Sequence, residues 1–134
     1  MDFLHTKTLA LKLMEQHGLL DQGWTFNFDR AKSRLGQCNY SAKQITVSKY
    51  MSAYADEETL TQVLLHEIAH ALLPIYGPNG KKIGHGLIWK QKAASIGYTG
   101  KRTAENPYLI ANPPKRKATT RKRNAKNPLP KSVR

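Results

Sequence analysis

The sequence contains very little cysteine: Cys38 is the only thiol in 134 residues. A single cysteine excludes an intramolecular disulfide and any zinc ribbon or finger built from cysteine ligands. Long apolar runs are also missing, because no stretch approaches the roughly 18 apolar residues that a membrane helix needs. The first residues do not resemble a signal peptide either. We therefore expect a protein of a reducing intracellular compartment, cytoplasmic or nucleoid-associated, that is neither secreted nor bound to a membrane.

Acidic residues are scarce toward the end of the chain. The sequence has 22 Lys and Arg against 9 Asp and Glu, a formal net charge of +13. Residues 1–99 hold 11 basic and 8 acidic side chains, which leaves +3. Residues 100–134 hold 11 basic side chains and one acid, Glu105, which leaves +10. This division predicts one domain over 1–99 and a basic tail over 100–134, and it disfavours a uniformly basic domain of the ribosomal-protein kind.

Apolar residues with helical spacing predict three helices in the domain. The first covers residues 2–18, and its apolar stripe ends at His17, which we interpret as a partly buried packing residue. The second begins at Asp56, a candidate N-cap, and is stopped by Pro74. The third covers 87–97 and follows a loop rich in glycine, proline and asparagine.

The apolar period changes to two between the first and second helices. Trp24, Phe26 and Phe28 alternate with polar residues, as in a half-buried strand. Residues 35–40 and 43–50 predict two further short strands. Together these segments predict an α+β fold with a small three-stranded antiparallel sheet.

His66, Glu67 and His70 form an HExxH sequence inside the second predicted helix. Histidines four residues apart lie on one helical face and can reach one metal ion. Glu67 would lie beside the metal, where it could take a proton from a water molecule and pass it to a leaving amine. The alternative is that both histidines only pack against the sheet.

A catalytic zinc site needs a third protein ligand and leaves one position for water. The remaining histidines are His5, His17 and His85. We favour His85 because the glycines on both sides would let the backbone approach the metal closely. The alternative for His85 is a loop histidine or a helix cap. The predicted Zn²⁺ ligands are His66, His70 and His85.

The segments LLHEIAHALL and GHGLIWKQKAASIG resemble the SprT-like zinc metallopeptidases, which include the Spartan-type proteases of DNA–protein crosslinks. The upstream RLGQCNYSAKQITVSKY is similar to the G-x-C strand of that family and the strand after it. The resemblance covers roughly residues 1–98. It implies a compact zincin-like α+β domain in which Glu67 is the catalytic acid/base, and the same three zinc ligands. It also implies a role in DNA repair.

The chain departs from the family in one respect. Many SprT-like proteins continue into a cysteine-containing zinc ribbon, which Cys38 alone cannot form. Engagement of DNA would therefore depend on the basic tail. We interpret Cys38, at the G-x-C position, as a small core residue, and Trp89 as a core packing residue.

The tail shows neither helical nor strand periodicity, and we expect it to be disordered when free. Its basic clusters could neutralise phosphates, with strong salt dependence and little base specificity. The predicted nucleic-acid-binding residues are Lys115, Arg116, Lys117, Arg121, Lys122, Arg123 and Lys126. The alternative is a solvated tail that aids solubility or targeting. Tyr108 could stack on a base, but we interpret it as an anchor onto the domain.

The leading hypothesis is a monomeric zinc-dependent endopeptidase that cleaves proteins bound or crosslinked to DNA. Its expected partners are DNA and DNA-bound protein substrates, with no membrane. One alternative is a DNA-binding or adaptor protein whose metal site is structural or non-proteolytic. Another is a metallopeptidase with no nucleic-acid role.

Overall fold

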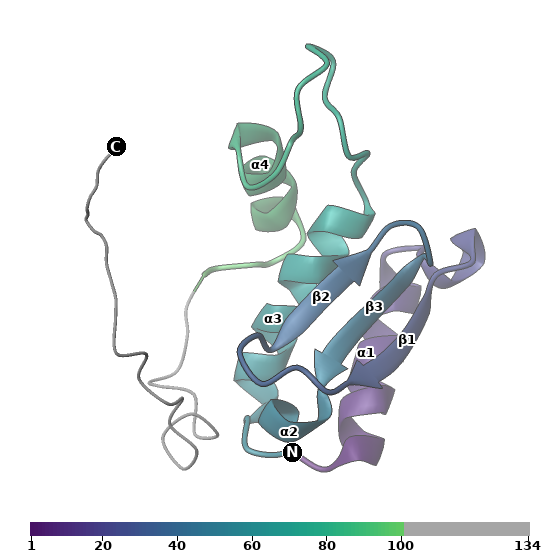
Figure 1. Ribbon diagram of the computed structural model, residues 1–134, viewed down its shortest axis with the longest axis vertical. Helices are drawn as coiled ribbons and strands as arrows, with labels where there is room; N and C mark the ends of the chain where they lie inside the picture. The colour runs from purple at the N-terminus through teal and green to yellow at the C-terminus, as the bar shows by residue number, and fades with distance from the viewer. Residues whose placement is uncertain (101–134) are drawn as a thin grey trace, which may run out of the picture.

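A computed structural model describes residues 1–100 of the chain, so the predicted tail beyond them lies outside the described residues. The fold is α+β, as predicted, with a small sheet covered by helices (Figure 1). Its elements are α1 (Phe3–Gln16), the 3-10 helix η1 (Leu20–Gln22), β1 (Thr25–Asp29), β2 (Gly36–Asn39), β3 (Gln44–Ser48), α2 (Lys49–Ser52), α3 (Glu57–Ala71) and α4 (Leu87–Ser95). No helix in this part of the chain is long and apolar enough to span a membrane.

The sheet is mixed, so the prediction of an antiparallel sheet is wrong for one of its two strand pairs. The strand order is β1-β3-β2, with β2 antiparallel and β1 parallel to β3. The reason is burial: four of the five β3 residues, Ile45 to Ser48, are buried, whereas β1 and β2 alternate between exposed and half-buried positions. A strand covered on both faces takes the centre of a sheet. The β2–β3 hairpin therefore leaves β1 only the far edge of β3.

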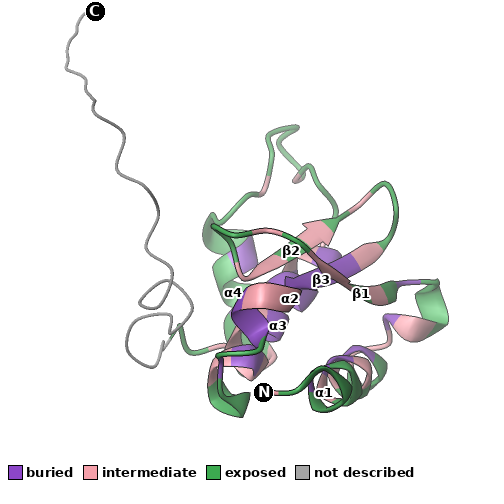
Figure 2. Cartoon of the chain, turned by 60° about the horizontal axis from the view of Figure 1, so that its bottom comes forward, coloured by how far each residue is buried: buried purple, intermediate pink, exposed green. Residues whose placement is uncertain are grey.

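Helices α1 and α3 lie side by side against the same face of the sheet (Figure 1). The burial colours of Figure 2 concentrate on α3 and β3, where the core is formed. The buried core residues are Ala10, Met14, Leu19, Trp24, Ile45, Val47, Leu64, Ile68 and Ala71. Leu64 and Ile68 are one turn apart on the face of α3 that meets the sheet. Positions 66 and 70 therefore point away from this face of the helix.

Local chemistry sets the helix ends. The side chain of Asp56 accepts a hydrogen bond of 2.8 Å from the backbone N–H of Thr59, which confirms Asp56 as the N-cap of α3. At the other end α3 stops at Ala71, three residues before Pro74. Helix α1 ends at a C-cap formed by His17, which is partly buried as predicted.

Candidate metal centre

Helix α3 presents His66 and His70 on consecutive turns, with ring centroids 5.1 Å apart. The third histidine arrives from a hairpin that projects beyond the helices in Figure 1. Tyr76 and Lys82 form a bridge in this hairpin, and the N–H of Ile83 donates to the carbonyl of Ile75 at 2.9 Å. The hairpin folds the chain back onto α3 and places the exposed His85 over the two helical histidines.

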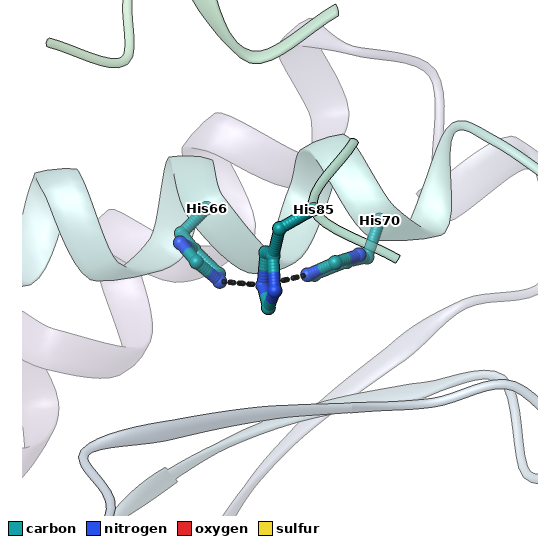
Figure 3. A group of neighbouring side chains, drawn as sticks. All are labelled: His66, His70 and His85. Atoms are coloured by element: carbon teal, nitrogen blue, oxygen red, sulfur yellow. Dashed lines mark hydrogen bonds between the residues drawn. The ribbon is translucent and has the colours of Figure 1, made fainter. Parts of the chain in front are cut away.

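The three imidazoles point toward one another (Figure 3). The Nε2 atom of His85 lies 3.0 Å from the Nε2 atoms of both His66 and His70. One nitrogen atom from each ring belongs to a group whose members all lie within 4.8 Å of one another. Zinc–nitrogen bonds of about 2.0–2.1 Å in a tetrahedral site separate two nitrogens by about 3.3–3.4 Å. Three imidazole nitrogens at this spacing fit a zinc ion and leave a fourth position for another ligand.

Trp89 of α4 packs against the rings of all three histidines. Its ring centroid lies 4.6 Å from that of His66, 5.2 Å from that of His70 and 4.9 Å from that of His85. Only 5% of the residue is exposed, and its Nε1 atom has no hydrogen-bond partner among the described residues. The predicted packing role is therefore confirmed, but the rings that Trp89 packs against are those of the predicted ligands.

The chain after α4 returns to α3 close to the histidines. Tyr98 packs edge-on against His66, with ring centroids 5.5 Å apart. The next residue, Thr99, donates its backbone N–H to Oε1 of Gln62 at 2.8 Å, and its hydroxyl lies 3.2 Å from the same atom. Gln62 precedes His66 by one helical turn. The last described residues are thus fastened to the helix that carries the site.

Tyr40 supports the other end of the site. It follows β2, and its hydroxyl donates a 2.8 Å hydrogen bond to the backbone carbonyl of His70. The same carbonyl accepts a second hydrogen bond of 3.1 Å from the backbone N–H of Leu73, just after the helix. The bond from Tyr40 therefore ties the turn that carries His70 to the end of β2. Burial raises the pKa of Tyr40 to about 12. Its hydroxyl therefore remains a donor at neutral pH.

Glu67 lies between α3 and β2 and is only 8% exposed. Burial raises the pKa of Glu67 to about 7, while the positive charge of Arg34 acts in the opposite direction. Burial also lowers the pKa of His70 to about 4, and His85 adds to this shift. His70 is therefore neutral at pH 7, the form in which an imidazole binds a metal.

Comparison with known proteins agrees with this geometry. The SprT-like family matches residues 5–109 of the chain. The chain belongs to the SprT-like family. Among solved structures, this SprT-like chain is similar to the crystal structure of the metallopeptidase zymogen jannalysin from Methanocaldococcus jannaschii. The similarity covers 67% of this chain and 79% of that chain, with 19% sequence identity and a TM-score of 0.52. At this identity it shows a shared fold. No curated protein sequence matches the chain.

The structure of this SprT-like chain brings His66, His70 and His85 together. Glu67 follows His66 in the same helix. His5 and His17 are outside this group: His5 pairs with Asp2 at 2.7 Å. The roles of the four site residues as ligands and acid/base remain predictions. All seven predicted nucleic-acid-binding residues, and Tyr108, lie outside the described residues.

Cys38 is partly buried on β2 and packs against the core, as predicted. Burial raises the pKa of its thiol to about 12, and the charge of Glu67 adds to this shift. The thiol is therefore protonated and not a reactive nucleophile at neutral pH. No sequence pattern indicates the hydrogen bond from Tyr40, because that residue lies thirty positions before His70.

Proposed function

We propose that the chain is a zinc-dependent endopeptidase of the HExxH type that acts on proteins bound or crosslinked to DNA. The observation that supports this most directly is the convergence of three imidazole nitrogens, with the buried Glu67 next to His66 in the same helix. Three histidines with one position left open are typical of catalytic zinc, whereas structural zinc sites are closed by four protein ligands. Membership of the SprT-like family and the fold shared with a metallopeptidase support the same conclusion.

Each residue of the site has a distinct role in this proposal. His66, His70 and His85 would hold the zinc ion through their Nε2 atoms. When bound, zinc would supply Lewis acidity, which polarises a peptide carbonyl and acidifies a water molecule. Glu67 would accept the proton of the attacking water on its carboxylate and donate it to the amine that leaves. Without metal, burial raises the pKa of the Glu67 carboxyl to about 7. The positive charge of bound zinc would lower this pKa and favour the carboxylate, which is the form that accepts the proton.

The sheet offers a place for the substrate. Strand β2 is an edge strand, and among residues 1–100 no other strand pairs with its outer side. It packs on α3 beside Glu67. An extended peptide could add to this edge through backbone hydrogen bonds, which bind without a strict demand on side chains. This arrangement would bring the scissile bond of an unfolded or protruding segment to the metal.

The DNA part of the proposal rests on charge. Residues 100–134 carry a net charge of +10, against +3 for the rest of the chain. A basic segment of this density would bind phosphates by releasing counterions, so its affinity for DNA should fall steeply with salt. The tail would then hold the peptidase near proteins that occupy the same DNA.

One experiment tests both parts. The full chain and its Glu67→Gln variant are loaded with zinc, checked for metal content, and incubated with a DNA-binding protein, with and without single-stranded DNA. We expect the wild type to cleave faster with DNA and the variant to keep its zinc but lose cleavage. Glu58→Gln, an exposed change on the same helix, serves as the control.

The outcomes separate the alternatives. Wild-type cleavage by Glu67→Gln would contradict the mechanism. Zinc binding without cleavage under any DNA condition would favour an adaptor with a structural metal. A chain truncated after residue 114 that keeps both DNA affinity and activity would favour a peptidase with no nucleic-acid role.

A further inference from the structure

Gly36, the first residue of β2, lies directly against the helix that carries the site. A β-carbon at position 36 would fall 2.7 Å from Cγ1 of Val63 and 3.2 Å from both Cγ and Oε2 of Glu67. Carbon atoms in favourable contact are about 3.5–4.0 Å apart, so these distances leave no room for a side chain. Gly36 is not among the described glycines with positive φ. Space, and not backbone conformation, therefore requires glycine here.

The two residues that Gly36 touches form one stripe of α3. Val63 and Glu67 are four residues apart, so their side chains lie on the same face, one turn above the other. The start of β2 presses on this stripe where the sheet and helix meet. None of the ion pairs of residues 1–100 involves the Glu67 carboxylate. Packing against β2 is thus a main determinant of where this carboxylate lies.

We propose that Gly36 is a positioning residue for Glu67. The bare Cα of Gly36 leaves the space that the Glu67 side chain occupies, and so determines where on α3 the carboxylate lies. Any side chain at position 36 displaces that carboxylate while leaving the histidines, on the other flank of the site, in place. The inference rests on the proposed function where it concerns catalysis, but the steric coupling between positions 36 and 67 does not.

The test must separate this role from simple loss of packing, because Gly36→Ala clashes with Val63 as well as with Glu67. Val63→Ala removes the closer of the two clashes and leaves the contacts with Glu67 unchanged. We therefore compare the wild type, Gly36→Ala, Val63→Ala and the double variant. Zinc affinity is measured by competition with a chromophoric chelator, thermal stability by circular dichroism, and kcat and KM on fluorescently labelled casein.

We expect Val63→Ala to resemble the wild type in zinc affinity and kcat. Gly36→Ala should lower the melting temperature and reduce kcat by about 10- to 100-fold, with little change in KM or zinc affinity. The double variant should regain melting temperature but not kcat. If relief of the Val63 clash restores kcat as well, the role of Gly36 is structural and the proposal is wrong. If Gly36→Ala does not fold, kcat of the double variant is compared with that of Val63→Ala.

A second measurement does not depend on activity. Gly36→Ala is introduced into Val63→Ala and into Val63→Ala/Glu67→Ala, and the melting temperatures of the zinc-free proteins are compared. Removing the Glu67 side chain beyond Cβ abolishes both remaining close contacts. The fall in melting temperature caused by Gly36→Ala should therefore be several-fold smaller in the second background. Equal falls would overturn the proposal even if the wild type cleaves casein. If the two falls differ as expected but the wild type does not cleave casein, only the proposed function is refuted and the positioning by Gly36 stands.

Discussion

Replacing Glu67 by glutamine should stabilise the metal-free protein, and the gain should grow with pH. Burial raises the pKa of the Glu67 carboxyl from 4.5 to about 7, so the folded state binds this proton more tightly than the unfolded state. The stability that the carboxyl contributes is fully present below pH 4.5 and is lost as the pH rises through about 7. A pKa difference of this size corresponds to at most about 3 kcal/mol. Glutamine keeps the shape of the side chain and never ionises, so the variant avoids the loss.

The contribution of His70 to stability depends on pH in the opposite direction. Because burial lowers its pKa from 6.5 to about 4, its contribution is present above pH 6.5 and is lost as the pH falls toward 4. Both proteins contain His70, so this contribution cancels in the difference between them. The difference in free energy of unfolding between the two proteins therefore reports only the contribution of the Glu67 carboxyl.

The assay is urea unfolding of both proteins in the presence of a chelator, from pH 4.5 to 8.5. The variant should match the wild type at the acid end and exceed its free energy of unfolding by about 1–3 kcal/mol at pH 8. The control Glu58→Gln should show no such trend. A difference that stays constant with pH, or a variant less stable at pH 8, would refute the reasoning.

Three further predictions concern the surroundings of the metal. Trp89→Phe should weaken zinc binding by about 10- to 100-fold, because the indole packs on the rings of all three predicted ligands. Trp24→Phe should leave zinc affinity unchanged, and competition with a chelator measures both. Tyr40→Phe removes the hydrogen bond to the His70 carbonyl and should lower the free energy of unfolding by about 1 kcal/mol. This loss corresponds to a fall of about 4–8 °C in melting temperature. An unchanged melting temperature would contradict the prediction. Zinc at about 1,000 times its dissociation constant should stabilise the wild type by about 4 kcal/mol in thermal melts. The same zinc concentration should leave the stability of His85→Ala nearly unchanged. Equal stabilisation of both proteins would exclude His85 as a ligand.

Helices α1, α3 and α4 could be predicted because their signals are local. The sequence pattern does not predict the short helices η1 and α2, and it wrongly assigns Lys49 and Tyr50 of α2 to the strand over 43–50. Asp56 and Pro74 lie within a few residues of the ends of α3, and a four-residue spacing is enough to put His66 and His70 on one face. His85 could be proposed from its glycine neighbours and from the resemblance to the SprT-like family. Its arrival at the other two histidines depends on the hairpin, which no periodicity reveals.

The sheet order could not be predicted in the same way. Both a simple meander and the observed order are compatible with three short strands, and the choice depends on which strand is buried on both faces. The β3 sequence QITVS contains polar residues at alternate positions, which suggests a half-exposed strand. In the structure Thr46 and Ser48 are buried, because Thr46 bonds to Asp29 at 2.6 Å and Ser48 to the carbonyl of Ala31 at 2.6 Å. Tertiary hydrogen bonds thus overrode the local pattern.

The attachment of Thr99 to Gln62 has a consequence for the affinity of the whole chain. Gln62 lies one helical turn before His66, so its bond to Thr99 holds this part of the chain close to the site. The segment from Gly100 to Lys115 spans at most about 50 Å even when fully extended. If Lys115 and its neighbours bind DNA, as proposed, a protein on the same DNA would be confined to a small volume around the site, at an effective concentration on the order of millimolar. Such a peptidase could have a weak, sequence-tolerant substrate groove and still be efficient, because selection of the target would come from proximity.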